Sequence, residues 1–227
     1  MSERPATTDP QDELFDVLDE HGNPTGQAKP RRLVHRDGDW HGALHIWIGG
    51  IDERGVPFVL FQRRSATKDT WPNALDVAVG GHIRAGETLA ETVREAEEEI
   101  GLPLRLDDVV CIGRRFAVGS GPGVQEREVQ EIYALHSDMP LGAYRLHPEE
   151  VDALVAPTID DVLQLAAGAV NEIAARERMR DAEADQFIRL RKSDFAGDGW
   201  TYATAALASL RSVIFGSTPT PFTLRVD

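Results

Sequence analysis

Apolar residues occur along this chain in short runs separated by glycine, proline and charged residues. The runs at residues 43–51 and 56–63 flank a charged turn at residues 52–55, which predicts an antiparallel hairpin. Other runs predict further short strands, at residues 14–18, 75–79, 109–117 and 128–135, with one more after Pro148. The strand at 75–79 leads directly into a glycine turn, so the segment after that turn starts from a sheet.

The segment after the glycine turn has helical periodicity. Four apolar residues fall on one stripe at helical spacing: Leu89, Val93, Ala96 and Ile100. Thr88 followed by Glu91 matches a capping box, and Gly101 lies where a helix C-terminal cap is expected. These signals predict a helix over residues 89–100 whose apolar stripe packs against a core.

Another face of this helix carries closely spaced carboxylates. At about 100° per residue, Glu95, Glu98 and Glu99 fall within an arc of about 100°. A run of glutamates is usually a solvated charged face. Crowded carboxylates can instead bind a cation, and hard oxygen ligands suit Mg²⁺ or Mn²⁺, which also bind phosphate oxygens. Arg94 precedes Glu98 by four residues and is placed to pair with it, which favours an organised metal site.

Residues 80–102 resemble the Nudix box. That motif consists of Gly, five residues, Glu, seven residues, Arg-Glu, an apolar residue, any residue, Glu-Glu, any residue, Gly and an apolar residue. Its defined positions are matched here by Gly81, Glu87, Arg94, Glu95, Glu98, Glu99, Gly101 and Leu102. The chain departs from the pattern at one point, because six residues, not seven, separate Glu87 from Arg94. The placement of Glu87 relative to the helix therefore stays open.

The resemblance implies an α/β fold of the Nudix type, an α/β/α sandwich with a mixed sheet between helices. It also implies Mg²⁺-dependent hydrolysis of a diphosphate linkage in a nucleoside diphosphate derivative or another organic diphosphate, with Mn²⁺ as a possible substitute. The implied metal ligands are three carboxylates and a main-chain carbonyl: Glu95, Glu98, Glu99 and Gly80 or Gly81. Arg94 would orient the carboxylates. A glutamate outside the box often completes such a site or acts as general base, and Glu128 and Glu150 both qualify.

Over residues 14–158 the resemblance is closest to the branch that contains type I isopentenyl diphosphate isomerase and related hydrolases. In the isomerases three histidines and two glutamates bind a metal, and the similar positions here are His35, His41, His82, Glu126 and Glu128. The basic residues that meet the diphosphate in those enzymes resemble Arg31, Arg64 and Lys68. However, Gly80 stands where the isomerases need a proton-transferring cysteine. Together with the retained box carboxylates, this favours hydrolysis.

Two alternatives to a hydrolase remain open. One is an isomerase-like enzyme, which the histidine and glutamate positions favour. The other is a catalytically inactive sensor that binds a diphosphate, which the shortened box motivates. The identity of the substrate is open in all three cases, because specificity in this family depends on loops outside the box.

Composition narrows the expected partners to small molecules. The 227 residues carry a formal net charge of −14, which argues against binding a nucleic-acid polymer or an anionic membrane, since phosphate surfaces need a basic footprint. No apolar run is long enough to span a bilayer, and the cytoplasm is the expected compartment. The single cysteine, Cys111, lies in an apolar run and is expected in the core.

The chain is expected to have three parts. Residues 1–11 are polar and expected to be disordered, residues 12–157 form the Nudix domain, and residues 158–227 form a helical C-terminal extension. Within the extension, the pattern predicts an amphipathic helix at residues 159–182, a second helical segment at 200–215 and an extended end at 218–227. Packing on the domain, a lid over the substrate and a homodimer contact are all open roles for it. The glycine-rich segment 118–123 is expected to be a loop, either closing over substrate or simply joining two strands.

Overall fold

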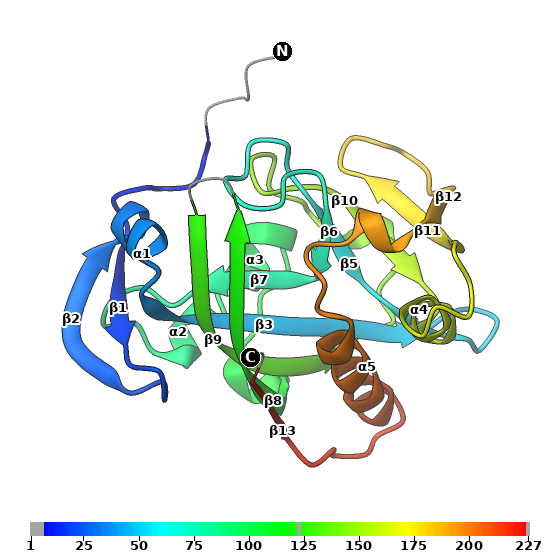
Figure 1. Ribbon diagram of the computed structural model, residues 1–227. Coiled ribbons are helices and arrows are strands. Elements are labelled where there is room, and N and C mark those ends of the chain that lie inside the picture. The colour runs from blue at the N-terminus through cyan, green and yellow to red at the C-terminus, as the bar shows by residue number, and fades with distance from the viewer. Residues whose placement is uncertain (1–6, 122–123, 226–227) are drawn as a thin grey trace.

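The computed structural model describes residues 7–121 and 124–225, and its strands form two sheets (Figure 1). The larger sheet has the order β13-β8-β9-β3-β1-β2, and β4 and β7 also pair with β3. Its strands are β1 (Leu14–Leu18), β2 (Pro24–Pro30), β3 (Trp40–Ile51), β4 (Pro57–Val59), β7 (Val79–His82), β8 (Val110–Gly121), β9 (Val124–His136) and β13 (Phe222–Arg225). The pairs β3/β9 and β8/β13 are parallel and the other pairs are antiparallel, so the sheet is mixed.

The smaller sheet has the order β12-β11-β10-β5-β6, and its neighbouring strands pair antiparallel. Its strands are β5 (Phe61–Arg64), β6 (Leu75–Val77), β10 (Val151–Pro157), β11 (Ile173–Met179) and β12 (Gln186–Leu190). The helices are α1 (Arg31–Asp37), α2 (Leu89–Thr92), α3 (Glu95–Ile100), α4 (Ile159–Ala166) and α5 (Trp200–Ile214), with short 3₁₀ turns η1 (Leu106–Asp108), η2 (Leu141–Ala143) and η3 (Lys192–Asp194). The expected α/β architecture with a mixed sheet is confirmed.

The predicted hairpin at residues 43–63 contributes strands to both sheets. Strand β4 pairs with β3 as expected, but after Leu60 the chain continues as β5 in the smaller sheet. Phe58, Val59, Leu60 and Phe61 are all buried. Because consecutive strand residues point to opposite faces, a run that is buried on both faces can join two layers, and its sequence alone does not show where it changes sheet.

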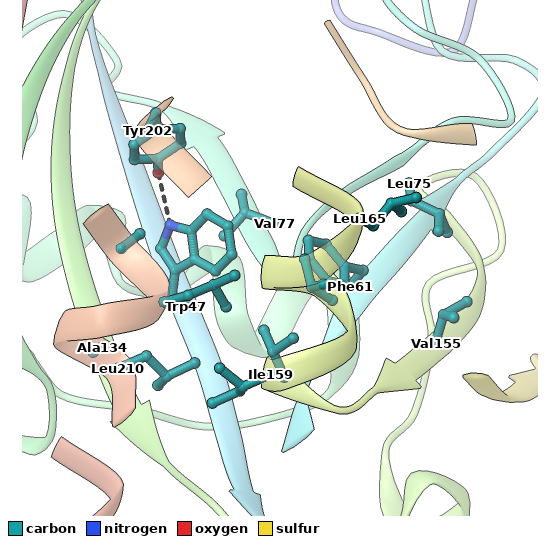
Figure 2. Packing of buried hydrophobic residues seen from close by; sticks show 14 of the residues in the cluster. Trp47, Phe61, Leu75, Val77, Ala134, Val155, Ile159, Leu165, Tyr202 and Leu210 are labelled. Atoms are coloured by element: carbon teal, nitrogen blue, oxygen red, sulfur yellow. Dashed lines mark hydrogen bonds between the residues drawn. The ribbon is translucent and has the colours of Figure 1, made fainter. Parts of the chain in front are cut away.

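The main hydrophobic core lies where the two sheets meet helices α4 and α5. Trp47 of β3 packs against Phe61 of β5, with Ile159 of α4 and Leu210 of α5 in the same cluster (Figure 2). The Trp47 indole donates a hydrogen bond to the hydroxyl of Tyr202 over 2.7 Å. Segments from both ends of the chain therefore share one core, and the C-terminal helix is part of it.

Three expectations, about a long helix, a disordered segment and a buried cysteine, need correction. The helix predicted at residues 159–182 ends at Ala166, and residues 173–190 form the hairpin β11-β12 instead. Gly168, with φ of 71°, follows the helix, and β11 then alternates buried and exposed residues, a strand pattern that the alanine-rich composition hides. The helix predicted at 200–215 and the extended end are confirmed as α5 and β13.

The other two corrections concern residues expected to be disordered or buried. Residues 1–6 lie outside the described range. Asp9 is only 5% exposed and pairs with Lys68, so residues 7–11 are ordered, contrary to the expectation of disorder. Cys111 is exposed, because strand alternation gives the core face to its neighbour Ile112. In the predicted loop at 118–123, residues 118–121 belong to β8 and residues 122–123 lie outside the described range.

Replacing Tyr202 by phenylalanine is expected to lower the free energy of unfolding by about 1–3 kcal/mol. The buried hydroxyl bonds both Trp47 Nε1 and, over 2.9 Å, His45 Nδ1, and its removal leaves these groups without a partner. Urea unfolding measures the effect, with Thr204→Ala as the control because Thr204 is exposed on the same helix. An unchanged free energy of unfolding for Tyr202→Phe would show that these bonds do not stabilise the docked helix.

Candidate functional site

A cavity of about 800 Å³ collects most of the residues that the sequence singled out. It is lined by the helix carboxylates, by glycines of β7, by the expected basic residues and by three further glutamates: Glu95, Glu98, Glu99, Gly80, Gly81, His82, Arg31, Arg64, Lys68, Glu126, Glu128 and Glu150. Arg94, His35 and His41 lie just behind this lining and contact its members. The complete lining includes residues of β3, β5, β6, β7, β8 and β9, of α3 and of the segment before α5, and all of them face one cavity.

The carboxylate helix is divided where one residue is missing from the expected spacing. The predicted helix at 89–100 is two helices, α2 and α3, joined at Val93 and Arg94. Main-chain bonds across the junction connect residues three apart, for example Arg94 N to Glu91 O at 3.1 Å and Glu97 N to Arg94 O at 2.9 Å. This tighter winding keeps Arg94 Nε within 2.8 Å of Glu87 Oε1, so Glu87 still contacts the helix.

Local signals in the sequence explain how this segment is terminated. Thr88 and Glu91 form the predicted capping box at the start of α2. Gly101 adopts the left-handed conformation, with φ of 67°, at the end of α3, as its position predicted. The start of α2 and the end of α3 are therefore both determined by nearby residues. These two caps hold α3 against the edge of the cavity.

Arg94 organises the exposed part of the carboxylate cluster. Its Nη1 donates to Glu95 Oε1 at 2.5 Å and to Glu98 Oε2 at 2.6 Å. Burial raises the pKa of Glu95 to about 7, although Arg94 opposes the shift. The Glu98 side chain remains 50% exposed, so its carboxylate is open to a cation from the cavity.

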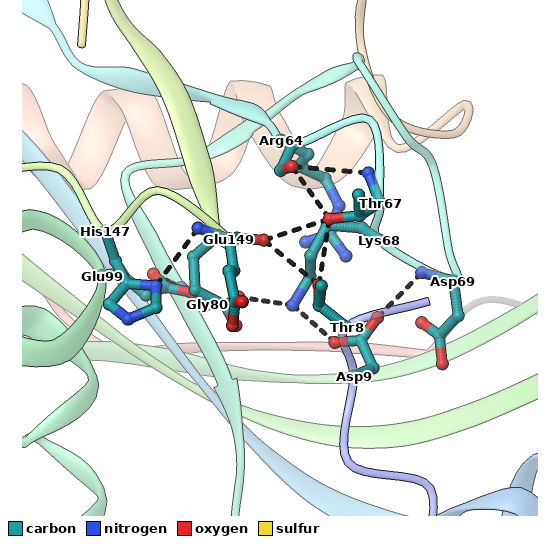
Figure 3. Close-up of polar contacts among 12 residues, drawn as sticks. Thr8, Asp9, Arg64, Thr67, Lys68, Asp69, Gly80, Glu99, His147 and Glu149 are labelled. Carbon is teal, nitrogen blue, oxygen red and sulfur yellow. Dashed lines mark hydrogen bonds and ion pairs between the residues drawn. The ribbon is translucent and has the colours of Figure 1, made fainter. Parts of the chain in front are cut away.

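Glu99 lies deeper, beneath the glycines of β7. Its Oε2 accepts hydrogen bonds from Gln62 Nε2 at 3.1 Å and from the Gly80 amide at 3.2 Å. Glu99 and Gly80 are labelled in Figure 3. Burial, with the nearby Glu95 charge, raises the pKa of Glu99 well above its usual value. A Cβ on Gly81 would lie 2.4 Å from Glu95 Cγ, so only glycine lets this helix approach the strand. A buried carboxylate of this kind calls for a proton or a cation.

Three histidines from distant parts of the chain converge beside the carboxylate helix. His35 of α1, His41 of β3 and His82 of β7 each place a ring nitrogen within 4.8 Å of the others. Phe15 of β1 stacks on His41 and His82, with ring centroids 5.4 and 4.7 Å away, and thereby fixes both rings. All three Nε2 atoms are buried, and among the described residues those of His35 and His41 lack a hydrogen-bond partner.

The electrostatics of this cluster suit a metal ion. Burial lowers the pKa of His35 to about 4 and that of His82 to about 3, so both imidazoles are neutral at physiological pH. Glu128 Oε1 lies 3.0 Å from His82 Nε2, and despite burial this contact holds the pKa of Glu128 well below its usual value. Burial and the adjacent Glu128 raise the pKa of Glu126 to about 8. Neutral imidazoles around an ionised carboxylate fit the expected second metal site.

The three basic residues expected to hold a diphosphate already have carboxylate partners. Arg31 lies 3.1 Å from Asp69, and Arg64 lies 3.3 Å from Asp76. Lys68 lies 2.6 Å from Asp9 and 2.5 Å from Glu150 (Figure 3 draws Lys68 with Asp9). These side chains line the cavity as predicted, but their charges are largely balanced within the protein. The sequence carried no signal for these partners, because they come from separate segments that only folding brings together, with Asp76 on β6 and Asp9 near the N-terminus.

Comparison with known proteins identifies the family. The model of the NUDIX domain matches residues 43–177, a range that runs from β3 into β11. The chain belongs to the Nudix family. It is 30% identical to an uncharacterized Nudix hydrolase of Clostridium acetobutylicum over 206 residues, which is 88% of this chain and 98% of that protein. It is 31% identical to an isopentenyl-diphosphate Delta-isomerase of Rhizobium rhizogenes, over 58% of this chain and 61% of that protein.

A solved structure from Deinococcus radiodurans is similar at 24% identity, covering 69% of this chain and 90% of that chain with a TM-score of 0.48. The sequence relationships indicate a Nudix-type pyrophosphohydrolase, an enzyme of a family that generally uses a divalent metal. None of the described helices is long and apolar enough to cross a membrane.

This Nudix cavity also has a wall that sequence reasoning missed. Phe195, Trp200 and Tyr202 line it from the C-terminal segment, and Trp47 and His45 face it from β3. The aromatic residues at the start of α5 and just before it were a weak signal, since aromatic residues in a helical segment are usually core residues. The C-terminal segment thus helps to shape the site as well as the core.

The two candidate metal sites are expected to respond differently to pH. Because burial raises the pKa of Glu95 to about 7, protons should compete with metal at the α3 carboxylates below that pH, weakening binding by up to about tenfold per pH unit. The imidazoles of the histidine cluster should stay neutral and able to bind metal there, since the pKa of His35 lies at about 4 and that of His82 at about 3. Mn²⁺ titrations followed by electron paramagnetic resonance above and below pH 7 measure this. The Glu95→Gln protein should lose the part of the pH dependence that Glu95 contributes, and a wild-type protein without any pH dependence would contradict the assignment.

Proposed function

We propose that this Nudix protein is a Mg²⁺-dependent hydrolase that cleaves a diphosphate linkage in a nucleoside diphosphate derivative or another organic diphosphate. The observation that carries the proposal is the cluster of Glu95, Glu98 and Glu99 at the wall of a large cavity, in which Arg94 holds Glu95 and Glu98. The buried, unpartnered histidine nitrogens nearby and the raised pKa of Glu95 are further support for cation binding. Mn²⁺ is expected to substitute, because it also binds carboxylate oxygens.

In the proposed mechanism the protein supplies ligands and orientation. Glu95, Glu98 and Glu99, with a main-chain carbonyl of Gly80 or Gly81, would hold Mg²⁺. Bound Mg²⁺ polarises a phosphoryl oxygen and lowers the pKa of a coordinated water. Arg94 keeps Glu95 and Glu98 in place through its two short contacts.

Glu150 is our choice for the base that accepts a proton from the attacking water. Its carboxylate faces the cavity beside Lys68, at 2.5 Å, on the side of Glu99. Glu128 is already engaged with His82 and His41, at 3.0 and 3.8 Å. We therefore assign Glu128 to the histidine cluster and not to the attacking water.

Isomerase activity is the second candidate, and the histidine and glutamate cluster together with isomerase-named relatives favours it. Against it stands Gly80, which has no side chain to transfer a proton to carbon. Residue 80 has only limited space in any case, since a Cβ there would lie 3.3 Å from Val77 Cγ1 and 3.8 Å from His45 Nε2.

One screen distinguishes the candidates. The protein is incubated with Mg²⁺ and nucleotide sugars, dinucleotides, nucleoside triphosphates or isopentenyl diphosphate, and products are identified by mass spectrometry, with EDTA as the metal-free control. We expect Mg²⁺-dependent cleavage between two phosphorus atoms in at least one compound. Dimethylallyl diphosphate as the sole product would establish the isomerase. Tight binding with no product from any compound would establish a sensor and end the hydrolase proposal.

A further inference from the structure

One cationic side chain in the cavity differs from all the others in its partners. The cations that line the cavity are Arg31, Arg64, Lys68, Arg84 and Arg115. The first four each pair with a carboxylate. Within residues 7–121 and 124–225, no carboxylate oxygen lies within 4.0 Å of Arg115, and its buried Nε has no acceptor. A guanidinium without a balancing anion inside a protein is costly unless a ligand supplies the charge.

Arg115 is nevertheless held firmly in place by neutral groups. Its guanidinium carbon lies 4.6 Å from the centre of the Tyr202 ring. Its Nη1 lies 3.4 Å from Gln130 Oε1, and the amide of Gln130 is oriented by a 2.6 Å bond from Nε2 to Glu128. A Cβ on Gly199 would approach Nη2 to 3.3 Å. These contacts hold the planar guanidinium in one orientation. Several of its N–H groups stay available to donate hydrogen bonds to a ligand.

Arg115 lies across the sheet from the carboxylate helix. In the larger sheet, Arg115 pairs with Gln130, Gln130 with Ala43 and Ala43 with His82. Three strand spacings thus separate β8 from β7, which corresponds to roughly 14 Å. Glu95 meets β7 at Gly81, whereas Arg115 is anchored over Tyr202 at the other side. A diphosphate bound at the carboxylates would lie beside β7, three strands away from the strand that carries Arg115.

We propose that Arg115 binds a second anionic group of the substrate, a carboxylate or phosphate monoester carried by its organic part. The inference rests on the proposed function, because it places the diphosphate at α3. The substrate class is then an elongated organic diphosphate with a separate negative charge at its far end. A cavity of about 800 Å³ has room for a molecule of that size. The Tyr202 ring and the Gly199 backbone leave the guanidinium edge as the contact for that anion.

Matched nucleotide pairs test the proposal directly. NADPH differs from NADH by one phosphate monoester, and UDP-glucuronate differs from UDP-glucose by one carboxylate. Dissociation constants are measured by calorimetry with Ca²⁺ in place of Mg²⁺. We expect the anion-bearing member of at least one pair to bind the wild-type protein at least about tenfold more tightly. The pair that shows the difference identifies whether the group is a phosphate monoester or a carboxylate.

Three variants assign the difference to Arg115. Arg115→Gln should abolish the preference while leaving binding of the plain member within about twofold, and Arg115→Lys should keep part of it, since the charge remains but the fork is lost. Arg114→Gln is the matched control, because Arg114 is the neighbouring residue on β8, is 48% exposed and pairs with Glu131 outside the cavity lining. It should leave the preference intact. Thermal unfolding verifies that each variant is folded.

The outcomes separate the inference from the proposed function. Three results would each overturn the role of Arg115. They are equal affinities within both pairs, no measurable binding of any of the four nucleotides, and an anion preference that is unchanged in folded Arg115→Gln. Turnover of the same nucleotides with Mg²⁺ is measured in parallel. An anion preference that depends on Arg115 without any turnover would support the binding site and count against the hydrolase proposal alone.

Discussion

Replacement of Glu98 by glutamine is expected to lower kcat about a thousandfold while hardly changing the stability of the protein. The carboxylate of Glu98 is half exposed and, among residues 7–121 and 124–225, its ion pairs are with arginine side chains alone, Arg94 at 2.6 Å and Arg84 at 3.9 Å. Loss of its charge therefore removes a metal ligand without opening the core. The turnover of the compound identified in the Mg²⁺ screen measures the effect, and added Mg²⁺ should restore only part of the rate.

Glu97→Gln is the matched control for this prediction. Glu97 is the preceding residue in α3, is exposed, and undergoes the same change in charge, but it does not line the cavity. Its kcat should remain near that of the wild-type protein. A Glu98→Gln protein with full turnover would remove the basis of the hydrolase proposal, whereas equal losses in both variants would indicate a general effect of charge on α3.

The sequence was most informative where local chemistry determines structure. The capping box at Thr88, the left-handed Gly101 and the strand β1 are all confirmed as predicted. Each depends on residues within a few positions, so spacing is enough to recognise it. The glycine turn and the carboxylates of α3 are recognisable for the same reason, and their spacing indicates the family from the sequence alone.

What the sequence did not reveal depends on contacts between distant segments. One predicted helix is divided into α2 and α3 in the segment that is one residue shorter than the box. The spacing shows the missing residue but not the break in the helix. The hairpin β11-β12 replaced a predicted helix because alanine-rich composition is compatible with both, and pairing with β10 decides between them. Asp9 pairs with Lys68 across 59 positions, and Tyr202 reaches Trp47 across 155. No local pattern encodes such partners.

The same limit applies to the candidate site. Arg31, Arg64 and Lys68 were expected at the cavity and do line it. In the folded arrangement each of the three is balanced by a carboxylate, whereas Arg115 has no such partner among the described residues. The sequence alone does not show either fact. The roles of these residues in binding remain predictions that the experiments above address.

Replacement of Gly81 by alanine is expected to reduce kcat/KM at least about a hundredfold, because a small displacement of a catalytic group can have an effect of that size. The new Cβ would lie 2.4 Å from Glu95 Cγ and 2.9 Å from Glu95 Oε2. Glu95 must then move away from the strand and from Arg94 Nη1, its present partner at 2.5 Å. Mn²⁺ affinity at the α3 carboxylates, followed by electron paramagnetic resonance, should fall together with the rate.

Gly80→Ala provides the comparison, since it adds the same methyl group one residue earlier. Its Cβ would meet Val77 Cγ1 at 3.3 Å and His45 Cδ2 at 3.7 Å, contacts that a small shift can relieve. The loss of activity should therefore be much smaller than in Gly81→Ala, although both glycines precede the same helix. If the two variants lose activity equally, the close approach of Glu95 to β7 is not what limits residue 81 to glycine. If Gly81→Ala keeps wild-type metal affinity and rate, Glu95 does not need its present position, and the assignment of this carboxylate to the metal site is wrong.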